Sequence, residues 1–180
     1  MKNKDNNIAY IDAANLHKGI KNQGWSLDYV RFRVWLREKH GVQTAYLFIG
    51  LVPKYKDLYT TLQQAGYVLI FKETIMDASG MPKGNCDADL VLRAVVDVFE
   101  TNFKRAVLVS SDGDYAVLVK FLLERNKLRA ILSPHKKDKC SILLKRTGAP
   151  ITYLDEVRTL TGSEKEKAPN ADGTAPGSFS

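Results

Sequence analysis

Aspartates gather in three short segments that lie far apart in the sequence. Asp12 ends one apolar run, Asp87 and Asp89 open an apolar helical segment, and Asp112 and Asp114 follow a second apolar run. Carboxylates held close together repel one another unless a cation offsets their charge. Their hard oxygen atoms suit Mg²⁺ or Mn²⁺ rather than zinc. If the chain brings these segments together, the sequence predicts a divalent-metal site that acts on phosphate esters.

Each aspartate taken alone also has an ordinary structural explanation. Asp12 suits a turn or helix cap, and the helix dipole favours acidic residues such as Asp87 in a first turn. Capping explains one acid in each segment better than two, so the paired Asp112 and Asp114 favour a functional site. Asn15, three residues after Asp12, could do the same local job, which weakens the structural explanation for Asp12.

Apolar runs alternate with amphipathic helical patterns along most of the chain. Continuous apolar strands between helices are typical of a parallel sheet that is covered on both faces. We therefore expect a doubly wound, three-layer α/β/α fold with a mainly parallel central sheet, which binds ligands at the carboxyl ends of its strands. The expected strands are residues 8–11, 45–49, 67–71, 106–109, 128–132 and 151–154. The expected helices are residues 27–39, 54–65, 87–100, a segment through Leu118 and Leu123, and residues 141–146, with a polar loop over residues 77–85.

The composition changes near residue 160. Residues 1–160 are expected to form the α/β domain, whereas residues 161–180 are polar and lack the apolar surface needed to order a chain. No apolar stretch approaches the roughly 20 residues that span a bilayer, and the polar N-terminal segment does not resemble a secretory signal. The isolated Cys86 and Cys140 fit a reduced, cytoplasmic setting.

Basic residues outnumber acidic residues by 27 to 20, which gives a formal net charge of +7 and a pI near 9.3. This balance favours a polyanionic partner such as nucleic acid. Lysines in the loops on the metal side could contact phosphates, and aromatic residues such as Tyr55 could stack on unpaired bases, although solubility explains any single lysine equally well. The expected substrate contacts are Lys54, Lys83, Lys136, Lys137, Ser110 and Ser111.

Three stretches in combination resemble the NYN-domain branch of the PIN-like nuclease superfamily. They occur in the family's order and on the expected elements, and the resemblance extends over about residues 8–160. The stretches are residues 8–16, 83–90 and 109–115.

This resemblance implies a doubly wound α/β domain with a Mg²⁺- or Mn²⁺-dependent ribonuclease site. One position departs from the family pattern, because Arg93 stands where relatives often carry a further acidic residue. The residues that the resemblance assigns to the site are Asp12, Asp87, Asp112 and Asp114 as acidic ligands, Asn15 beside them and Asp89 as a further member.

The function expected from the sequence is a metal-dependent endoribonuclease that acts on single-stranded RNA. The alternative is a catalytically weak or inactive RNA-binding module with the same acidic pocket, which Arg93 and the short chain favour. A phosphatase with an aspartyl nucleophile is disfavoured, because Ala14 stands where its second carboxylate would follow Asp12. The sequence leaves open RNA versus DNA, endo- versus exonuclease action and a homodimer.

Overall fold

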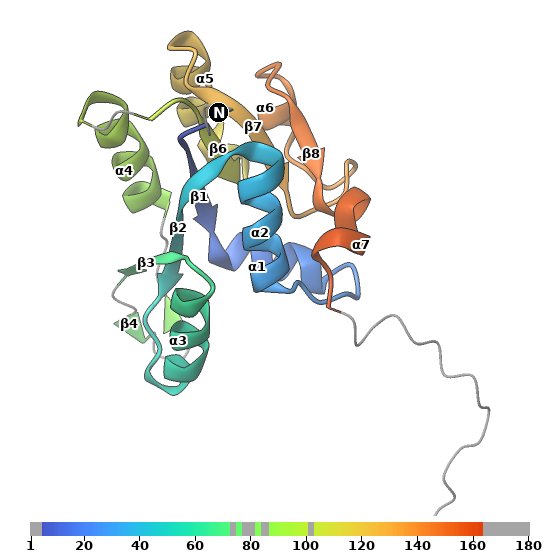
Figure 1. Cartoon of the computed structure of the whole chain (residues 1–180). Helices are drawn as coiled ribbons and strands as arrows, with labels where there is room; N and C mark the ends of the chain where they lie inside the picture. The colour runs from blue at the N-terminus through green and yellow to red at the C-terminus, as the bar shows by residue number, and fades with distance from the viewer. Residues whose placement is uncertain (1–4, 73–74, 77–81, 84–86, 101–102, 164–180) are drawn as a thin grey trace, which may run out of the picture.

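The computed structural model describes residues 5–72, 75–76, 82–83, 87–100 and 103–163. In this part of the chain, six parallel strands form one sheet in the order β3-β2-β1-β6-β7-β8. Helices cover both faces of the sheet, which gives three layers (Figure 1). The expected doubly wound α/β/α fold is confirmed.

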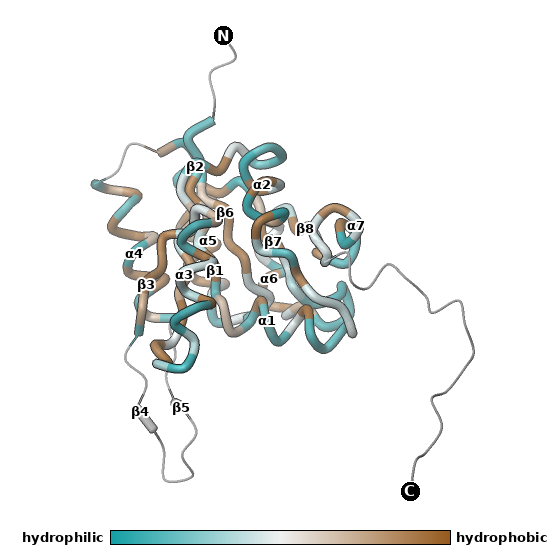
Figure 2. Tube along the Cα trace, turned by 60° about the horizontal axis from the view of Figure 1, so that its bottom comes forward, coloured by the Kyte–Doolittle hydropathy of each residue, from teal (hydrophilic) through white to brown (hydrophobic). Residues whose placement is uncertain are grey.

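The sheet consists of β1 (Asn7–Asp12), β2 (Val42–Gly50), β3 (Val68–Lys72), β6 (Ala106–Val109), β7 (Leu128–Ser133) and β8 (Ile151–Tyr153). One face carries α1 (Ala13–Lys21), α2 (Tyr29–His40) and α3 (Lys56–Gln64), with α7 (Arg158–Thr161) against α2. The other face carries α4 (Asp87–Glu100), α5 (Ala116–Glu124) and α6 (Ile142–Lys145). The 3₁₀ turns are η1 (Pro53–Tyr55), η2 (Gly113–Tyr115) and η3 (Leu154–Val157). Two short strands, β4 (Ile75–Met76) and β5 (Pro82–Lys83), pair antiparallel away from the main sheet (Figure 2).

The two sides of each central strand build two separate hydrophobic cores. Along β1, Ala9 and Ile11 pack with α1 and α2, while Ile8 and Tyr10 pack with α4 and α5. Strands covered on both faces need apolar residues throughout, and Figure 2 shows that hydrophobic residues are concentrated in these central strands. Because side chains alternate along a strand, Asp12 falls on the same face as Tyr10. The first acidic residue therefore faces the side of the sheet that α4 covers.

The order of the strands brings the first and third acidic segments together. From β1 the chain adds β2 and β3 on one side, and from β6 it adds β7 and β8 on the other. Ligands of doubly wound folds bind beyond the carboxyl ends of the strands at such a switch point. Asp12 is the last residue of β1, and Ser110 directly follows β6. The two acidic segments thus leave neighbouring strands at the expected ligand-binding edge.

Two local features differ from the sequence-based expectation. The helix α1, which directly follows β1, was missed because its nine residues carry few large apolar side chains at helical spacing. The polar loop expected over residues 77–85 lies outside the described residues, except for Pro82 and Lys83 of β5. By contrast, the expected end of α3 before Gly66 is confirmed, since Gly66 takes a φ of 93° that glycine adopts without strain.

The chain stays in contact with the domain up to the end of its described part. Thr161 is fully buried, and Leu27 forms an isolated antiparallel bridge with Gly162. Residues 164–180 lie outside the described residues, so the domain boundary expected at residue 160 stays a prediction. Within the described part of the chain, no helix combines the length and apolar character needed to cross a membrane.

Candidate metal centre and adjoining pocket

Three carboxylates meet beyond the carboxyl ends of β1 and β6. Asp87, Asp112 and Asp114 each offer one oxygen atom, and these oxygens lie within 4.8 Å of one another. Asp87 and Asp112 are half-buried and Asp114 is exposed, so the group is open to solvent. Neighbouring ligand oxygens around Mg²⁺ lie about 3 Å apart in an octahedron with bonds of about 2.1 Å. Small side-chain rotations bridge this difference, so the three residues fit a divalent ion that keeps part of its water shell.

Asp12 joins this group through Tyr115. The hydroxyl of Tyr115 donates toward both neighbouring carboxylates, with its oxygen 2.5 Å from Asp87 Oδ1 and 3.2 Å from Asp12 Oδ2. Burial, together with these two carboxylates, holds the pKa of Tyr115 well above its ordinary value, so the phenol stays protonated. Burial also raises the pKa of Asp12, and the charges of Asp87 and Asp112 add to this effect. A cation bound here would relieve that repulsion.

Two of these aspartates cap the helical turns that follow β1 and β6, so backbone N–H groups hold their side chains in place. Asp12 Oδ1 accepts a hydrogen bond from the Asn15 N–H at 3.0 Å and caps α1. Asp112 Oδ1 accepts one from the Asp114 N–H at 3.1 Å and caps η2. Capping uses only Oδ1 of each carboxylate. The same aspartate can therefore cap a helix and still offer its other oxygen to the site.

Gly113 is required by close packing between Asp112 and Asp114. A Cβ atom at this position would collide with the hydroxyl of Ser141 and lie 3.1 Å from a methyl group of Leu143. A side chain here would force the Ser141 hydroxyl, which caps α6, and the Leu143 side chain to move. The glycine therefore keeps both aspartates on a turn that packs tightly against the domain.

Asn15 is oriented by a hydrogen-bond network that joins the ends of two strands. Its Oδ1 accepts hydrogen bonds from the Ser111 N–H and the Ser111 hydroxyl, both at 2.9 Å. Ser111 Oγ lies 2.6 Å from His135 Nδ1, and since the hydroxyl has given its one proton to Asn15, His135 donates in this contact. Burial and the nearby Lys18 lower the pKa of His135, which favours the neutral ring. Because Oδ1 is occupied twice, Asn15 can present its NH₂ group to a ligand.

Three of the other expected site residues contact protein groups instead of the acidic cluster. Asp89 is half-exposed and lies 3.7 Å from Lys72 Nζ, so the structure does not bring it to the three carboxylates. Ser110 is fully buried and accepts a hydrogen bond from the Asp112 N–H. Ser111 holds Asn15, as described above. The two serines thus position other site residues.

The expected phosphate-binding lysines lie on different elements of the chain. Lys136 and Lys137 are exposed and directly follow His135, whose contact with Ser111 ties this turn to the site. Lys54 is exposed before α3, with its Nζ 5.0 Å from the centre of the Tyr55 ring. The side chain of Lys83 lies outside the described residues.

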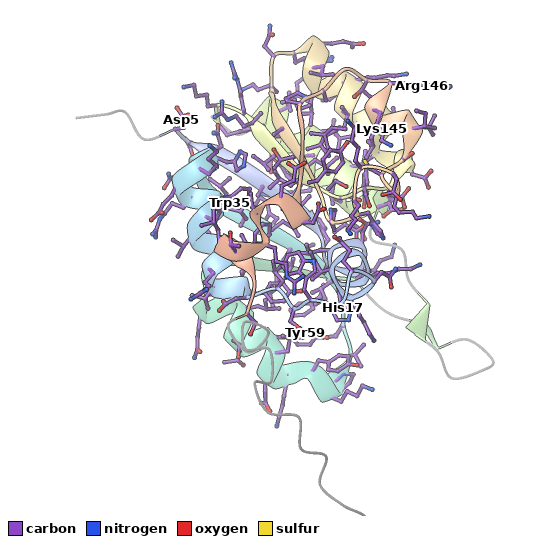
Figure 3. The ribbon with its side chains drawn as sticks, turned by 90° about the vertical axis from the view of Figure 1, so that its right-hand side faces the viewer. Asp5, His17, Trp35, Tyr59, Lys145 and Arg146 are labelled. Carbon is purple, nitrogen blue, oxygen red and sulfur yellow. The ribbon has the colours of Figure 1, made fainter. Side chains whose placement is uncertain are left out.

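A pocket of about 630 Å³ adjoins the carboxylates. Figure 3 shows His17 of α1 and Tyr59 of α3, two of its lining residues, on the same side of the molecule. The sequence indicated its acidic end and Tyr55, whereas Phe48 and Tyr59 were missed, because they lie in patterns that also describe a hydrophobic core. The lining includes Asp12, Asn15, His17, Lys18, Tyr29, Phe48, Ile49, Val52, Tyr55, Leu58, Tyr59, Leu62, Asp87 and Asp112.

Arg93 of α4 belongs to a separate group of side chains, which come from α4, β1 and β2. Its Nε lies 3.0 Å from Asp97 Oδ2, its Nη2 donates to the Tyr46 hydroxyl at 2.6 Å, and its guanidinium lies over the Tyr46 ring. Asp97 is 2% exposed and also accepts a hydrogen bond from the Tyr10 hydroxyl at 2.9 Å. The arginine therefore neutralises a buried carboxylate farther along the helix.

The sequence profile of the NYN domain matches residues 8–148, which includes every residue of the acidic cluster. The chain belongs to the NYN domain family. VPA0982 from Vibrio parahaemolyticus RIMD 2210633, a protein of unknown function with a crystal structure, shares the fold of this NYN domain. The two align with a TM-score of 0.70 and 22% sequence identity over 87% of this chain and 97% of that chain. No curated protein matches the sequence. Family membership confirms the expected assignment and indicates a nuclease-like function on nucleic acid, with a carboxylate group that could hold a metal ion.

Proposed function

We propose that this NYN domain is a divalent-metal-dependent endoribonuclease that hydrolyses phosphodiester bonds of single-stranded RNA. The observation that carries this proposal is the meeting of acids from three distant segments at the switch point of the sheet. Asp87, Asp112 and Asp114 offer oxygens to one centre, and Asp12 joins them through Tyr115. In a protein with a net charge of +7, such an acidic site suits a metal ion and a phosphate strand.

Each group of residues has a defined part in the proposed reaction. Asp87, Asp112 and Asp114 would hold the ion, while Asp12 adds negative charge next to it. When bound, Mg²⁺ or Mn²⁺ supplies an activated water and stabilises the charge that develops on the phosphate. The NH₂ group of Asn15 can donate a hydrogen bond to a non-bridging phosphate oxygen. Exposed lysines at the rim would hold the phosphates on either side, with Lys54, Lys136 and Lys137 as the candidates in the described chain and Lys83 as a further one.

Arg93 pairs its positive charge with an acid outside the proposed metal ligands. Its guanidinium is engaged with Asp97 and Tyr46, so it has a structural task outside the carboxylate group. A cytoplasmic location, expected from the isolated cysteines, and a homodimer belong to the same proposal; the mass of the purified chain in solution tests the dimer.

The proposal is tested with the purified full chain and a short labelled single-stranded RNA in Mg²⁺, Mn²⁺ or EDTA. We expect internal cleavage with either ion and none in EDTA. Asp12→Asn and Asp112→Asn should lose cleavage and keep the fold, as judged by circular dichroism. Asp89→Asn, purified in the same way, is the matched control and should keep cleavage. If the wild type binds RNA without cutting it and the two site variants bind as well or better, the chain is an RNA-binding module.

A further inference from the structure

The pocket beside the carboxylates has two chemically different ends. Asp12, Asp87 and Asp112 line one end. The other end is aromatic and aliphatic, with Phe48 from β2, Tyr55 from η1, and Leu58 and Tyr59 from α3 among its walls. Its volume of about 630 Å³ falls in the range of sites for small organic ligands. A hydrated ion and a phosphate group need only the acidic end, so the apolar end leaves room for a flat, apolar group attached to that phosphate.

We propose that the apolar end receives one unpaired base of the nucleic-acid strand, from the nucleotide next to the phosphate held at the carboxylates. This subsite rests on the proposed nuclease function and specifies its substrate class: a strand whose base is free to leave the stack at the site of cleavage.

Tyr55 provides the stacking surface. Its side chain is 44% exposed, and Lys54 Nζ lies 5.0 Å from the centre of its ring. An aromatic ring that carries a cation at the pocket rim can stack on a base and contact the adjoining phosphate at once. This combination of charge and ring favours a nucleotide over an uncharged apolar ligand.

Tyr59 forms a fixed part of the pocket wall. Its hydroxyl accepts a hydrogen bond from the Val52 N–H and donates to the Gly50 carbonyl, both at 2.9 Å. Its ring packs edge-on against Phe71, with the ring centres 4.9 Å apart. The wall is therefore already formed without a ligand, which reduces the entropy lost when a base binds.

The pairing of β1 with β2 places an acidic and an aromatic residue of the pocket side by side. Phe48 is the direct partner of Asp12 in the parallel ladder, so Phe48 and the Asp12 carboxylate lie on the same face of the sheet. Neighbouring strands lie about 4.8 Å apart, a distance that the sugar of one nucleotide can span. Asn15 and His17 of α1 also line the pocket and offer polar atoms to that sugar or to the base edge.

Helices α1 and α3 both contribute to the lining, which limits access for a base within a duplex. A paired base would have to break its pair and rotate out of the stack before it could enter. A single strand does not have to break base pairs. The pocket therefore selects unpaired RNA by the cost of unpairing, without reading a particular sequence.

The test compares short single-stranded RNAs that differ only by one abasic nucleotide, moved stepwise along the strand. For the wild type, an abasic nucleotide next to a cleavage site should slow cleavage there by about 5- to 100-fold, the amount one stacked base contributes. Tyr55→Ala should slow cleavage of the intact strand by a similar factor and remove the abasic effect, whereas Tyr55→Phe should restore both. Phe99→Ala is the matched control, because Phe99 is an exposed aromatic residue of α4 that is not part of the pocket lining.

The outcomes separate this subsite from the nuclease proposal. Cleavage that is insensitive to the abasic nucleotide and to Tyr55→Ala overturns the subsite alone, as does equal cleavage of single strands and a fully paired duplex. Absence of cleavage overturns the nuclease proposal. In that case the same strands are compared by binding affinity with Mg²⁺ present: a Tyr55-dependent loss of affinity for the abasic strand upholds the base subsite, and equal affinities overturn it.

Discussion

Two buried carboxylates lie where β1 meets α4, and their negative charges are balanced in different ways. Asp97, 2% exposed, is ion-paired with Arg93 and accepts a hydrogen bond from the Tyr10 hydroxyl. Asp12, 7% exposed, accepts hydrogen bonds from two neutral donors, the Asn15 N–H and the Tyr115 hydroxyl, and lies near further carboxylates. The protein itself supplies the cation that pairs with Asp97, namely Arg93. The group around Asp12 is suited to bind a cation from solution.

This difference shows that burial alone does not separate a structural acid from a functional one. A buried charge is costly unless it is paired and hydrogen-bonded. Around Asp97 the pairing is complete within the protein, and burial beside Asp97 raises the pKa of Tyr10, so its hydroxyl remains a donor. Around Asp12 the neighbouring charges have the same sign. The charge of the groups around a buried acid therefore distinguishes a structural acid from a functional one.

The largest expected effect is on cleavage. Asp12→Asn and Asp112→Asn should each slow RNA cleavage by more than about 100-fold, since even the outer partners of metal ligands contribute about 10- to 100-fold. Asp97→Asn should leave the rate per folded molecule nearly unchanged. Single-turnover cleavage of a labelled RNA, corrected for the folded fraction, measures both. An Asp97→Asn variant that is fully folded and inactive would contradict the distinction between the two acids.

The same substitution should affect stability with opposite signs at the two positions. Asp97→Asn should lower the free energy of unfolding by about 2 kcal/mol, because the hydrogen bonds from Arg93 and Tyr10 lose their charged acceptor. In EDTA, Asp12→Asn should raise it by about 1 kcal/mol, because asparagine still caps α1 while one repelling charge is removed. Urea unfolding measures both values, and the half-exposed Asp89→Asn is expected near zero. A clear loss of stability in Asp12→Asn would mean that its charge is already compensated within the protein.

The acidic segments could be predicted because parallel strands deliver their carboxyl ends to one edge. The bounds expected for β6 and α4 agree with the structure, since uninterrupted apolar runs and a strongly amphipathic helix are clear local patterns. Asp89 was expected as a further ligand, yet two residues along an α-helix turn a side chain by about 200°. That rotation separates Asp89 from Asp87 and leaves it beside Lys72.

Other parts of the site could not be predicted because they depend on contacts between distant residues. Tyr115 reaches Asp12 across 103 residues of sequence, and no local pattern indicates which tyrosine will end beside which acid. The network that orients Asn15 likewise needs Ser111 and His135 from two other segments. Phe48 and Tyr59, the buried aromatic residues of the apolar end, were missed for a related reason, since the wall of a pocket and a core have the same composition.

His40 offers a third case, in which a buried group remains uncharged. It is 7% exposed, and burial together with Arg129 and Lys39 lowers its pKa to about 4. The ordinary value is about 6.5, so below that pH the unfolded chain binds the proton more strongly than the folded one. The free energy of unfolding should therefore fall by about 2 kcal/mol between neutral pH and about pH 5. Urea unfolding across this range measures the slope, and His40→Leu should remove it; an unchanged slope would assign the effect to other groups.

Metal binding tests whether the carboxylates around Asp12 take up a cation from solution. With Mg²⁺ at several times its dissociation constant, the wild type should gain about 1 kcal/mol of stability, seen as a rise in the midpoint of thermal unfolding. Asp112→Asn should lose this gain and Asp97→Asn should keep it. An equal gain in all three proteins would place the ion elsewhere on the molecule.

The smallest expected effect concerns the orientation of Asn15. Ser111→Ala removes the hydroxyl bond to Asn15 Oδ1 and the contact with His135, while the Ser111 backbone N–H still holds the carboxamide. One hydrogen bond is worth about 1 kcal/mol, so cleavage should slow by about 5-fold with little change in metal affinity. In an Asn15→Ala background the same substitution should have no further effect, because the group that it positions is gone. Additive losses in the double variant would show that Ser111 acts on the substrate directly. The Asn15 carboxamide would then not depend on its hydrogen bonds with Ser111.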